Sequence, residues 1–261
     1  MAILNCTPDS FSDGGRFLAP DAALHRAEAQ LDAGADIVDV GGESTRPGAD
    51  HVPAAEETRR VVPVISELRR RRPEALISVD TRKLSVAAAA LAAGADIVND
   101  VTAASAPGML ELVAAAGAAI ILMHMRGEPQ TMQTDTSYED VVSEVFGYLG
   151  QRAVEARRAG IPDRLVWLDP GIGFGKDVAG NVQLLAELPR LAELGHPLLV
   201  GPSRKSFIGG LTGAPVDDRL PGTLAALIPI IGLERVVVRV HEPAAVVQFL
   251  EVSVSLREAA S

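Results

Sequence analysis

The sequence contains little cysteine and few aromatic residues, and both shortages limit what the chain can be. Its one cysteine, Cys6, excludes an intramolecular disulfide and any zinc site built from cysteine alone. Aromatic residues make up 3% of the 261 residues and hydrophobic residues 48%, so a core must consist mainly of Val, Ile, Leu and Ala. This composition is typical of buried parallel strands covered by alanine-rich helices.

Positive charge and long apolar runs are also scarce. The formal net charge is −10 at pH 7, which argues against nucleic acid as a partner because a phosphate backbone requires a basic face. No apolar run approaches the roughly 20 residues of a membrane-spanning helix, and no secretory signal pattern opens the chain. We therefore expect a cytoplasmic protein without a membrane partner.

A short internal repeat indicates the architecture. The segment AGADIVDV begins at Ala33 and its near copy AGADIVND begins at Ala93, which marks a repeated strand-and-helix unit. Short apolar runs between turn residues predict strands at 2–5, 36–40, 76–80, 96–100, 119–124, 165–169, 197–201 and 235–240. Helical patterns alternate with them at 20–34, 54–72, 83–93, 107–117, 138–160, 180–194, 217–231 and 243–258. This alternation predicts a closed (β/α)8 TIM barrel, with residues 1–261 as one domain.

Polar residues stand at the carboxyl end of every predicted strand. In a barrel these ends meet on one face, where active sites of this fold lie. Each residue could instead cap a helix or a turn, and for two of them, Asp39 and Asp100, both interpretations stay open. Capping does not explain all of the polar ends at once. They are Asn5, Asp39, Asp80, Asn99 with Asp100, His124, Asp169, Ser203 to Lys205, and Arg239 with His241.

The acidic and the basic strand ends predict different contacts. Asp80, Asn99 and Asp169 either form internal ion pairs or accept hydrogen bonds from the N–H edge of a flat ligand. Lys205 follows the seventh strand, and the pair Arg239 and His241 ends the eighth. Barrels often bind phosphate at the loops after these two strands, so we expect a small anionic ligand.

Three loops add further candidates. Asn5 opens the first loop with an amide oxygen suited to Mg²⁺ on a diphosphate, and Phe11 lies in its turn-rich middle, as in a lid. The second loop, GGESTRPG, holds Thr45–Pro47, where Arg46 either binds ligand or pairs with a rim carboxylate. The run LDPGIGFGK resembles a phosphate loop without matching the Walker pattern, and Phe174 in it could stack on an aromatic ring. No His and Cys spacing indicates zinc.

Eight segments together resemble one known family. The segments are ILNCTPDSFSDGG, DVGGESTRPGA, SVDT, VNDV, LMHMRGEPQTMQ, LDPGIGFGK, GPSRKS and VRVHE, and they resemble the dihydropteroate synthase family in order and nearly end to end. The resemblance implies a pterin-binding barrel of folate biosynthesis. Such an enzyme joins 7,8-dihydropterin-6-ylmethyl diphosphate to p-aminobenzoate and releases diphosphate with Mg²⁺. It also implies a homodimer, with sulfonamides as inhibitors.

The resemblance assigns roles residue by residue. Asn5 would bind Mg²⁺ and, with Arg239 and His241, the diphosphate. The pterin site would be Asp80, Asn99, Met123, Asp169, Gly201 and Lys205, with Asp169 ionised near its ordinary pKa of ~3.9. The p-aminobenzoate site would be Phe11, Thr45, Arg46, Pro47, Phe174 and Ser203. The catalytic group would be Asp80, Lys205, Arg239 and His241.

Departures from the family pattern raise one further hypothesis. Cys6 replaces a common aliphatic residue and is expected to act as a small hydrophobe. Pro229 interrupts a predicted helix and should kink it. Pro202 stiffens the turn before Ser203, on the p-aminobenzoate side, which suggests altered sulfonamide sensitivity.

Three rival functions stay open at this point. A methyltetrahydrofolate-dependent methyltransferase would share the Asp and Asn residues but would not need Arg239 and His241 for diphosphate. A non-catalytic pterin-binding barrel would keep every motif without turnover. An aldolase could use Lys205 to form a Schiff base.

Overall fold

In the described part of the chain, eight parallel strands form one sheet that curls into a barrel. The computed structural model describes residues 1–7, 19–44 and 48–259, of which residues 19 and 20 are described for their backbone only. The strands pair in chain order: β1 (Ala2–Asn5), β2 (Ile37–Gly41), β3 (Leu76–Asp80), β4 (Ile97–Asp100), β5 (Ala119–Met123), β6 (Val166–Asp169), β7 (Leu198–Val200) and β8 (Val236–Val238). Ile3 N donates to Val240 O at 3.0 Å, which joins β1 to the segment after β8. The predicted (β/α)8 barrel is confirmed.

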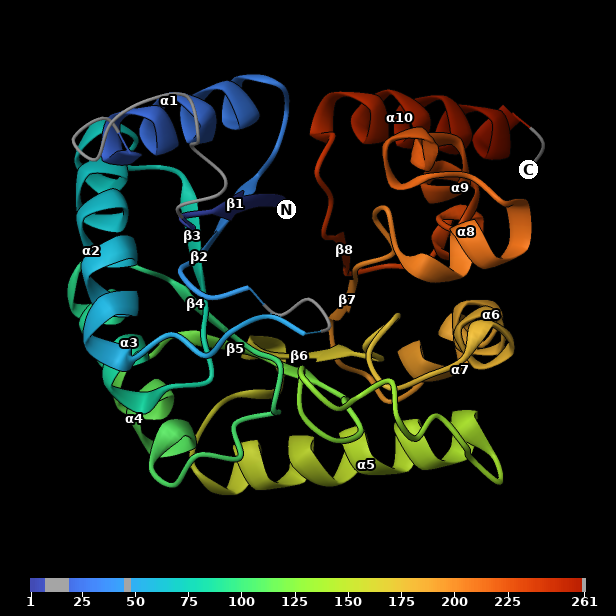
Figure 1. Ribbon diagram of the computed structural model, residues 1–261, viewed down its shortest axis with the longest axis horizontal. Helices are drawn as coiled ribbons and strands as arrows, with labels where there is room; N and C mark the ends of the chain where they lie inside the picture. The colour runs from blue at the N-terminus through green and yellow to red at the C-terminus, as the bar shows by residue number, and fades with distance from the viewer. Residues whose placement is uncertain (8–18, 45–47, 260–261) are drawn as a thin grey trace.

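Helices surround the strands on the outside (Figure 1). They are α1 (Ala19–Asp32), α2 (Ala54–Arg71), α3 (Leu84–Ala92), α4 (Met109–Ala116), α5 (Val141–Arg158), α6 (Val178–Ala186), α7 (Leu188–Ala192), α8 (Ser206–Thr212), α9 (Leu220–Ala225) and α10 (Pro243–Ala259). Short 3₁₀ turns lie at η2 (Asp163–Leu165), η3 (Val216–Asp218) and η4 (Ile228–Ile230). None of the helices within the described ranges combines the length and the apolar character needed to cross a membrane.

Two predicted helices are wrong as single elements, and one helix was not predicted. The pattern at 180–194 divides into α6 and α7, and the pattern at 217–231 divides into η3, α9 and η4. Prolines lie at these breaks, in the first turns of α7, α9 and η4, where the missing N–H donor costs no helix hydrogen bond. Pro229 therefore lies at the start of η4 rather than kinking a longer helix. Helix α8 was not predicted because it is short and contains two glycines, which have low helix propensity.

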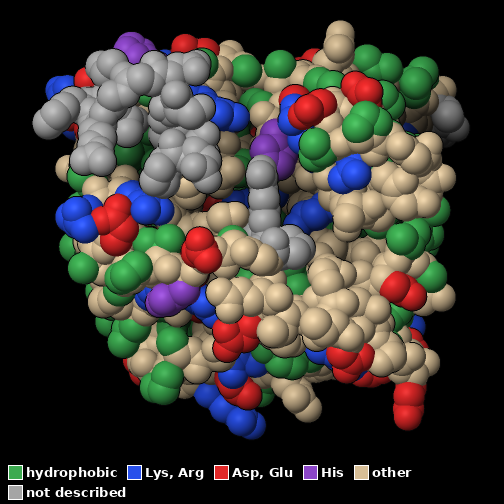
Figure 2. All heavy atoms as spheres, in the orientation of Figure 1, with side chains coloured by type: hydrophobic (Ala, Val, Ile, Leu, Met, Phe, Trp, Pro, Cys, Tyr) green, Lys and Arg blue, Asp and Glu red, His purple; other side chains and the backbone are tan. Residues whose placement is uncertain are grey.

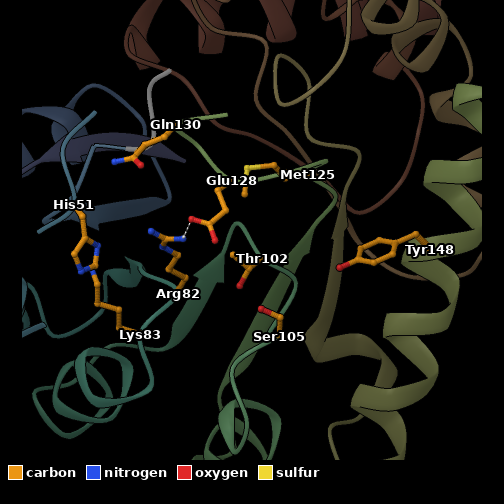
Figure 3. Close-up of a pocket in the computed structure, with 10 residues that line it drawn as sticks. His51, Arg82, Lys83, Thr102, Ser105, Met125, Glu128, Gln130 and Tyr148 are labelled. Atoms are coloured by element: carbon orange, nitrogen blue, oxygen red, sulfur yellow. Dashed lines mark ion pairs between the residues drawn. The ribbon is translucent and has the colours of Figure 1, made fainter. Parts of the chain in front are cut away.

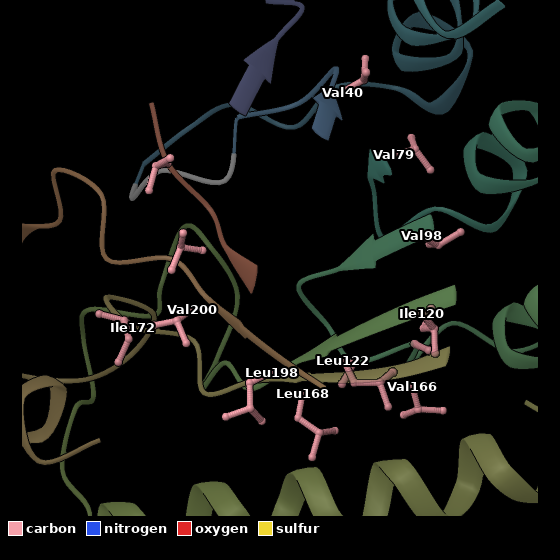
Figure 4. Packing of buried hydrophobic residues seen from close by; sticks show 14 of the residues in the cluster. Val40, Val79, Val98, Ile120, Leu122, Val166, Leu168, Ile172, Leu198 and Val200 are labelled. Carbon is pink, nitrogen blue, oxygen red and sulfur yellow. The ribbon is translucent and has the colours of Figure 1, made fainter. Parts of the chain in front are cut away.

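Side chains alternate along each strand between the helix layer and the barrel interior. Outward residues such as Val40, Val98 and Leu168 pack against the helices, and Figure 4 shows this layer. Inward residues of the lower barrel form a separate apolar cluster: Met1, Ile37, Ile97, Ala119, Ile121 and Leu199. Most of the inward positions nearer the carboxyl ends are polar, with Met123 and Gly201 among the exceptions. The same strand alternation that fills the core thus directs Asn5, Asp80, Asn99 and Asp169 to the barrel mouth.

Two polar side chains have partners that the local sequence pattern does not indicate, and one core assignment is confirmed. Arg69, in the last turn of α2, donates from Nη2 to Gly94 O at 2.9 Å and from Nη1 to Ala75 O at 2.8 Å. His196 is buried, with Nδ1 3.2 Å from Asp163 O. Cys6 lies in the core, where burial raises the pKa of its thiol to about 12, so it acts as a small hydrophobe.

Leu168→Ala tests the layer between the barrel and its helices. Leu168 is fully buried, so truncation removes apolar contact and leaves a cavity, and we expect a loss of about 2–5 kcal/mol in the free energy of unfolding. Leu256→Ala is the matched control, because Leu256 is 68% exposed and should change stability by less than about 0.5 kcal/mol. Urea denaturation followed by circular dichroism measures both. Equal losses would contradict the assigned packing.

Candidate active site

A cavity of about 560 Å³ opens at the carboxyl ends of the strands. Side chains from every strand end or the loop that follows it line this cavity, because all inward positions at this level point to the barrel axis. In Figure 2, Lys, Arg and His side chains border a hollow in the middle of the face in view. The predicted site residues that line the cavity are Asn5, Asp80, Asn99, Met123, Asp169, Phe174, Gly201, Ser203, Lys205, Arg239 and His241.

The remaining predicted site residues cannot be placed. Phe11 and the segment Thr45 to Pro47 lie outside the residues that the structure describes. The neighbouring residues Glu43 and Ser44 do line the cavity, so the second loop borders it up to that point.

Arg239 ties three strands together at the floor of the cavity. Its Nε donates to Asp39 Oδ2 at 2.6 Å, and its Nη2 donates to Asp80 Oδ2 at 2.7 Å. Asn99 Nδ2 donates to the same Asp39 oxygen at 3.1 Å. Asp39 is fully buried and does not line the cavity, so it acts by orienting Arg239 and Asn99 rather than by touching a ligand.

The other strand-end acid left open by the sequence has a different role. Asp100 points outward from β4, and its Oδ1 accepts hydrogen bonds from Thr102 N and Thr102 Oγ1, both at 2.7 Å. It therefore caps the turn after β4, whereas Asp39 lies beneath the cavity.

Burial raises the pKa of Asp80 and of Asp169, two of the aspartates that line the cavity. The pKa of Asp80 is raised to about 7, chiefly because burial disfavours the carboxylate; Arg239 opposes this rise and the nearby charge of Asp39 adds to it. The pKa of Asp169 is also raised by burial, against the hydrogen bond from Gly171 N at 2.7 Å and the charge of Lys205. The expectation of an ordinary pKa for Asp169 is therefore wrong, because a side chain 5% exposed loses most of its hydration.

Phe174 and Lys205 form the opposite wall. The Lys205 ammonium lies 3.9 Å from the centre of the Phe174 ring, a cation–π contact. Phe174 is not an exposed loop tip, since it is 9% exposed and packs with Val101, Met123 and Met132. A Cβ on Gly173 would lie 2.8 Å from Lys205 Cδ, so only glycine lets the Lys205 stem lie against this loop.

Ser203 fixes the orientation of His241. The Ser203 hydroxyl lies 2.9 Å from His241 Nδ1, and it also accepts a hydrogen bond from His241 N at 3.2 Å. With Nδ1 engaged, Nε2 is the ring nitrogen directed to other partners. Ser203 therefore supports a histidine of the basic wall, a role that the sequence did not indicate.

Sequence reasoning missed several other lining residues. Ser206, the first residue of α8, lines the cavity, as does Arg219. The signal for Ser206 was present in the segment SRKS, one residue after Lys205. Arg219 comes from beyond α8, and only the folded chain brings its guanidinium to Arg204 O, at 3.1 Å.

A second cavity of about 800 Å³ lies beside the first, over the loops that follow β3, β4 and β5 (Figure 3). Its cations are already paired: Lys83 with Glu43 and Glu57, and Arg82 with Glu43 at 3.5 Å and Glu128 at 3.6 Å. Because these charges cancel locally, the second cavity does not concentrate one sign of charge. The first cavity, which brings Asp80, Asn99 and Asp169 together with Lys205, Arg239 and His241, is the candidate active site.

The fold and this cavity define a class of protein: a (β/α)8 barrel enzyme whose cavity at the carboxyl ends of the strands contains both carboxylates and basic side chains. The chain belongs to the family described as pterin binding enzyme, whose profile matches residues 1–241.

Named relatives agree with this membership. The chain is 46% identical over 258 residues to a dihydropteroate synthase of Synechocystis sp., an alignment that covers 98% of this chain and 89% of that protein. It is also similar to two structures of the Xanthomonas albilineans dihydropteroate synthase, each covering 98% of this chain and 92% of the other. One contains 4-aminobenzoic acid (47% identity, TM-score 0.91) and the other 7,8-dihydropteroate (44% identity, TM-score 0.88).

Asp39→Asn should lower the pKa of Asp80 below its value of about 7. The substitution removes a negative charge near Asp80. Among the described residues, Arg239 then has Asp80 as its one negatively charged hydrogen-bond partner, which favours the Asp80 carboxylate. Titration of ¹³C-labelled aspartate by NMR measures the change. Asp100→Asn is the control, since Asp100 has a weaker effect on Asp80 and should shift it less. An unchanged or raised Asp80 midpoint in Asp39→Asn would contradict the arrangement.

Proposed function

We propose that this chain is a dihydropteroate synthase, in which residues 1–261 act as one pterin-binding domain. The enzyme condenses 7,8-dihydropterin-6-ylmethyl diphosphate with p-aminobenzoate to give 7,8-dihydropteroate and diphosphate. One observation carries the proposal: a single cavity joins Asp80, Asn99 and Asp169 to Lys205, Arg239 and His241. The membership of the family and the named relatives support it, and they do not favour the methyltransferase, the silent barrel or the aldolase.

The acidic floor suits the pterin ring. The ring presents an amino group and a ring N–H side by side, and a carboxylate accepts two parallel hydrogen bonds from such an edge. We assign this contact to Asp169, whose Oδ1 is already aligned by Gly171 N. Asp80, with a pKa of about 7, can donate or accept a hydrogen bond near neutral pH, and Asn99 adds an amide beside it. Met123 and Gly201 complete the ring site, and Lys205 reaches a ring acceptor.

The basic wall holds the leaving group. When the methylene C–O bond breaks, the electron pair goes to the diphosphate and the pterin stabilises the positive methylene carbon. Arg239 uses Nε and Nη2 for Asp39 and Asp80, whereas its Nη1 makes no hydrogen bond with the described residues and is the donor we assign to diphosphate. His241, oriented by Ser203, is the second donor. Fixed donors at the developing charge lower the barrier without reorganisation.

The amine then attacks the methylene carbon. The neutral nitrogen of p-aminobenzoate supplies the electron pair for the new C–N bond, and its proton leaves to solvent or to diphosphate. We place its ring near Phe174 and Lys205, with Ser203 and Ser206 at the same end of the cavity. Phe11, Thr45, Arg46 and Pro47 are proposed to cover this end and exclude water.

The residues present fit one Mg²⁺ ion. Mg²⁺ prefers oxygen ligands and is commonly bound through substrate phosphates with few protein ligands. Asn5 contributes such an oxygen on the same cavity wall as Arg239 and His241. We propose that Asn5 holds Mg²⁺ together with the diphosphate, where the ion would neutralise the leaving group.

Three further properties are part of the proposal. We propose a cytoplasmic homodimer, and exposed apolar side chains such as Leu211 (60%) and Ile228 (61%) offer contact area for it. Sulfonamides should compete with p-aminobenzoate. Altered sulfonamide sensitivity through Pro202 stays a hypothesis, since Pro202 is buried and does not line the cavity. Sulfonamide inhibition constants equal to those of the Synechocystis relative would contradict this hypothesis.

A coupled assay for diphosphate release tests the proposed function. We expect release only when both the pterin diphosphate and p-aminobenzoate are present, with dihydropteroate as the second product and with activity lost on removal of Mg²⁺ by EDTA. Pterin diphosphate binding without product would instead support a silent barrel. Methyl transfer from methyltetrahydrofolate would support the methyltransferase, and borohydride trapping of Lys205 the aldolase.

Asp169→Asn should weaken pterin diphosphate binding by about 10- to 100-fold. The neutral amide loses a charge-assisted hydrogen bond worth about 1.5–3 kcal/mol. Calorimetric titration with and without Mg²⁺ measures the dissociation constant. Asp100→Asn is a matched control, because Asp100 is equally buried but bonds Thr102 outside the cavity. Equal weakening in both variants would argue against Asp169 as the pterin partner.

A further inference from the structure

Lys176 ends the glycine-rich segment that resembles a phosphate loop, yet its ammonium turns inward. The side chain is 3% exposed. Its Nζ donates to His124 O at 3.0 Å, Gly171 O at 3.0 Å and Phe174 O at 2.9 Å. An ammonium has three N–H donors, and these three carbonyls account for all of them. Lys176 is therefore not available to bind a phosphate.

The three carbonyls belong to the backbone that presents one side of the cavity. His124 directly follows Met123 at the end of β5. Gly171 donates its own N–H to Asp169 Oδ1 at 2.7 Å. Phe174 holds its ring against the Lys205 ammonium. One ammonium thus joins the loop after β5 to the loop after β6, next to three lining side chains.

The two loops meet backbone to backbone at this point. A Cβ on Gly171 would lie 2.0 Å from His124 O and 3.1 Å from Lys176 Nζ, and the Gly171 φ of +67° favours glycine. Asn181 supports the loop from the other side, since its Oδ1 accepts from Gly173 N at 2.6 Å and its Nδ2 donates to Lys176 O at 3.1 Å. The two loops therefore pack around the Lys176 ammonium, which bonds three of their backbone carbonyls.

We propose that Lys176 is a positioning residue for the side of the cavity formed by Asp169 and Phe174. Its ammonium locks the two loops so that Gly171 N–H stays on Asp169 and the Phe174 ring stays against Lys205. The identification of the ligand as a pterin rests on the proposed function. The predicted effect of Lys176 on the Asp169 carboxyl does not rest on it.

The charge of Lys176 acts in the same direction as its hydrogen bonds. It lowers the pKa of Asp169, as do Gly171 N–H, Lys205 and Arg239, against the raising effect of burial. Burial also lowers the pKa of Lys176 itself to about 7, with Lys205 and Arg126 adding to the fall and Asp169 opposing it. Loss of the Lys176 charge and of the loop contact should both favour protonated Asp169.

Lys176→Met, studied without ligand, tests this effect directly. The Asp169 carboxyl, assigned in ¹³C NMR spectra by comparison with Asp169→Asn, should titrate at least about 0.5 pH units higher in Lys176→Met than in the wild type. Lys83→Met is the control, because Lys83 is a partly buried ammonium whose partners Glu43 and Glu57 lie outside this loop. An unchanged Asp169 midpoint, or an equal rise in Lys83→Met, would overturn the proposal.

Kinetics provide the second readout. In Lys176→Met the KM for pterin diphosphate should rise about tenfold with a smaller change in the KM for p-aminobenzoate, since the pterin contact depends on Asp169. Lys176→Gln keeps two N–H donors and should recover part of the loss; it also replaces the Met variant if that variant does not fold. A uniform fall in activity that tracks melting temperature would overturn the positioning role. A wild type that releases no diphosphate would reject the proposed function but leave the NMR result valid.

Discussion

The buried guanidinium of Arg239 constrains the whole mouth of the barrel. A charge removed from water is costly unless it is paired and hydrogen-bonded, and Arg239 finds its partners on two other strands, at Asp39 and Asp80. Asn99 joins through Asp39. The contact between Arg239 and Asp39 spans 200 positions in the chain, so the floor exists only when the barrel is closed. The orientation of Asp80, Asn99 and Arg239 in the cavity follows from this network.

The same burial sets the protonation of the site. Asp80 and Asp169 are two of the carboxyl groups that line the cavity, and both have raised pKa values because burial removes most of their hydration. Arg239 opposes this rise at Asp80, whereas the Gly171 N–H, Lys205, Lys176 and Arg239 oppose it at Asp169. Groups on the neighbouring strands and loops thus limit how far burial raises each pKa.

The sequence predicted the architecture and the cavity side chains because both depend on local pattern. Alternating strands with polar ends must point alternate residues inward, so Asp80, Asn99, Asp169 and Arg239 could be grouped without coordinates. The local pattern failed at the segment 217–231, which divides at its prolines. It also did not indicate that Arg69 donates to Gly94 O or that His196 is buried against Asp163 O. Asp169 looked like an ordinary carboxylate because its exposure depends on loops far along the chain.

The sequence by itself determined the strand order, the inward positions and, through its motifs, the family. Only the tertiary structure decided the partners: that Asp39 supports the floor whereas Asp100 caps a turn, that Ser203 orients His241, and that Lys176 bonds backbone carbonyls instead of phosphate. The physical reason is that local periodicity fixes the direction in which a side chain points. Its hydrogen-bond partners and its hydration depend on residues brought together by closure of the barrel.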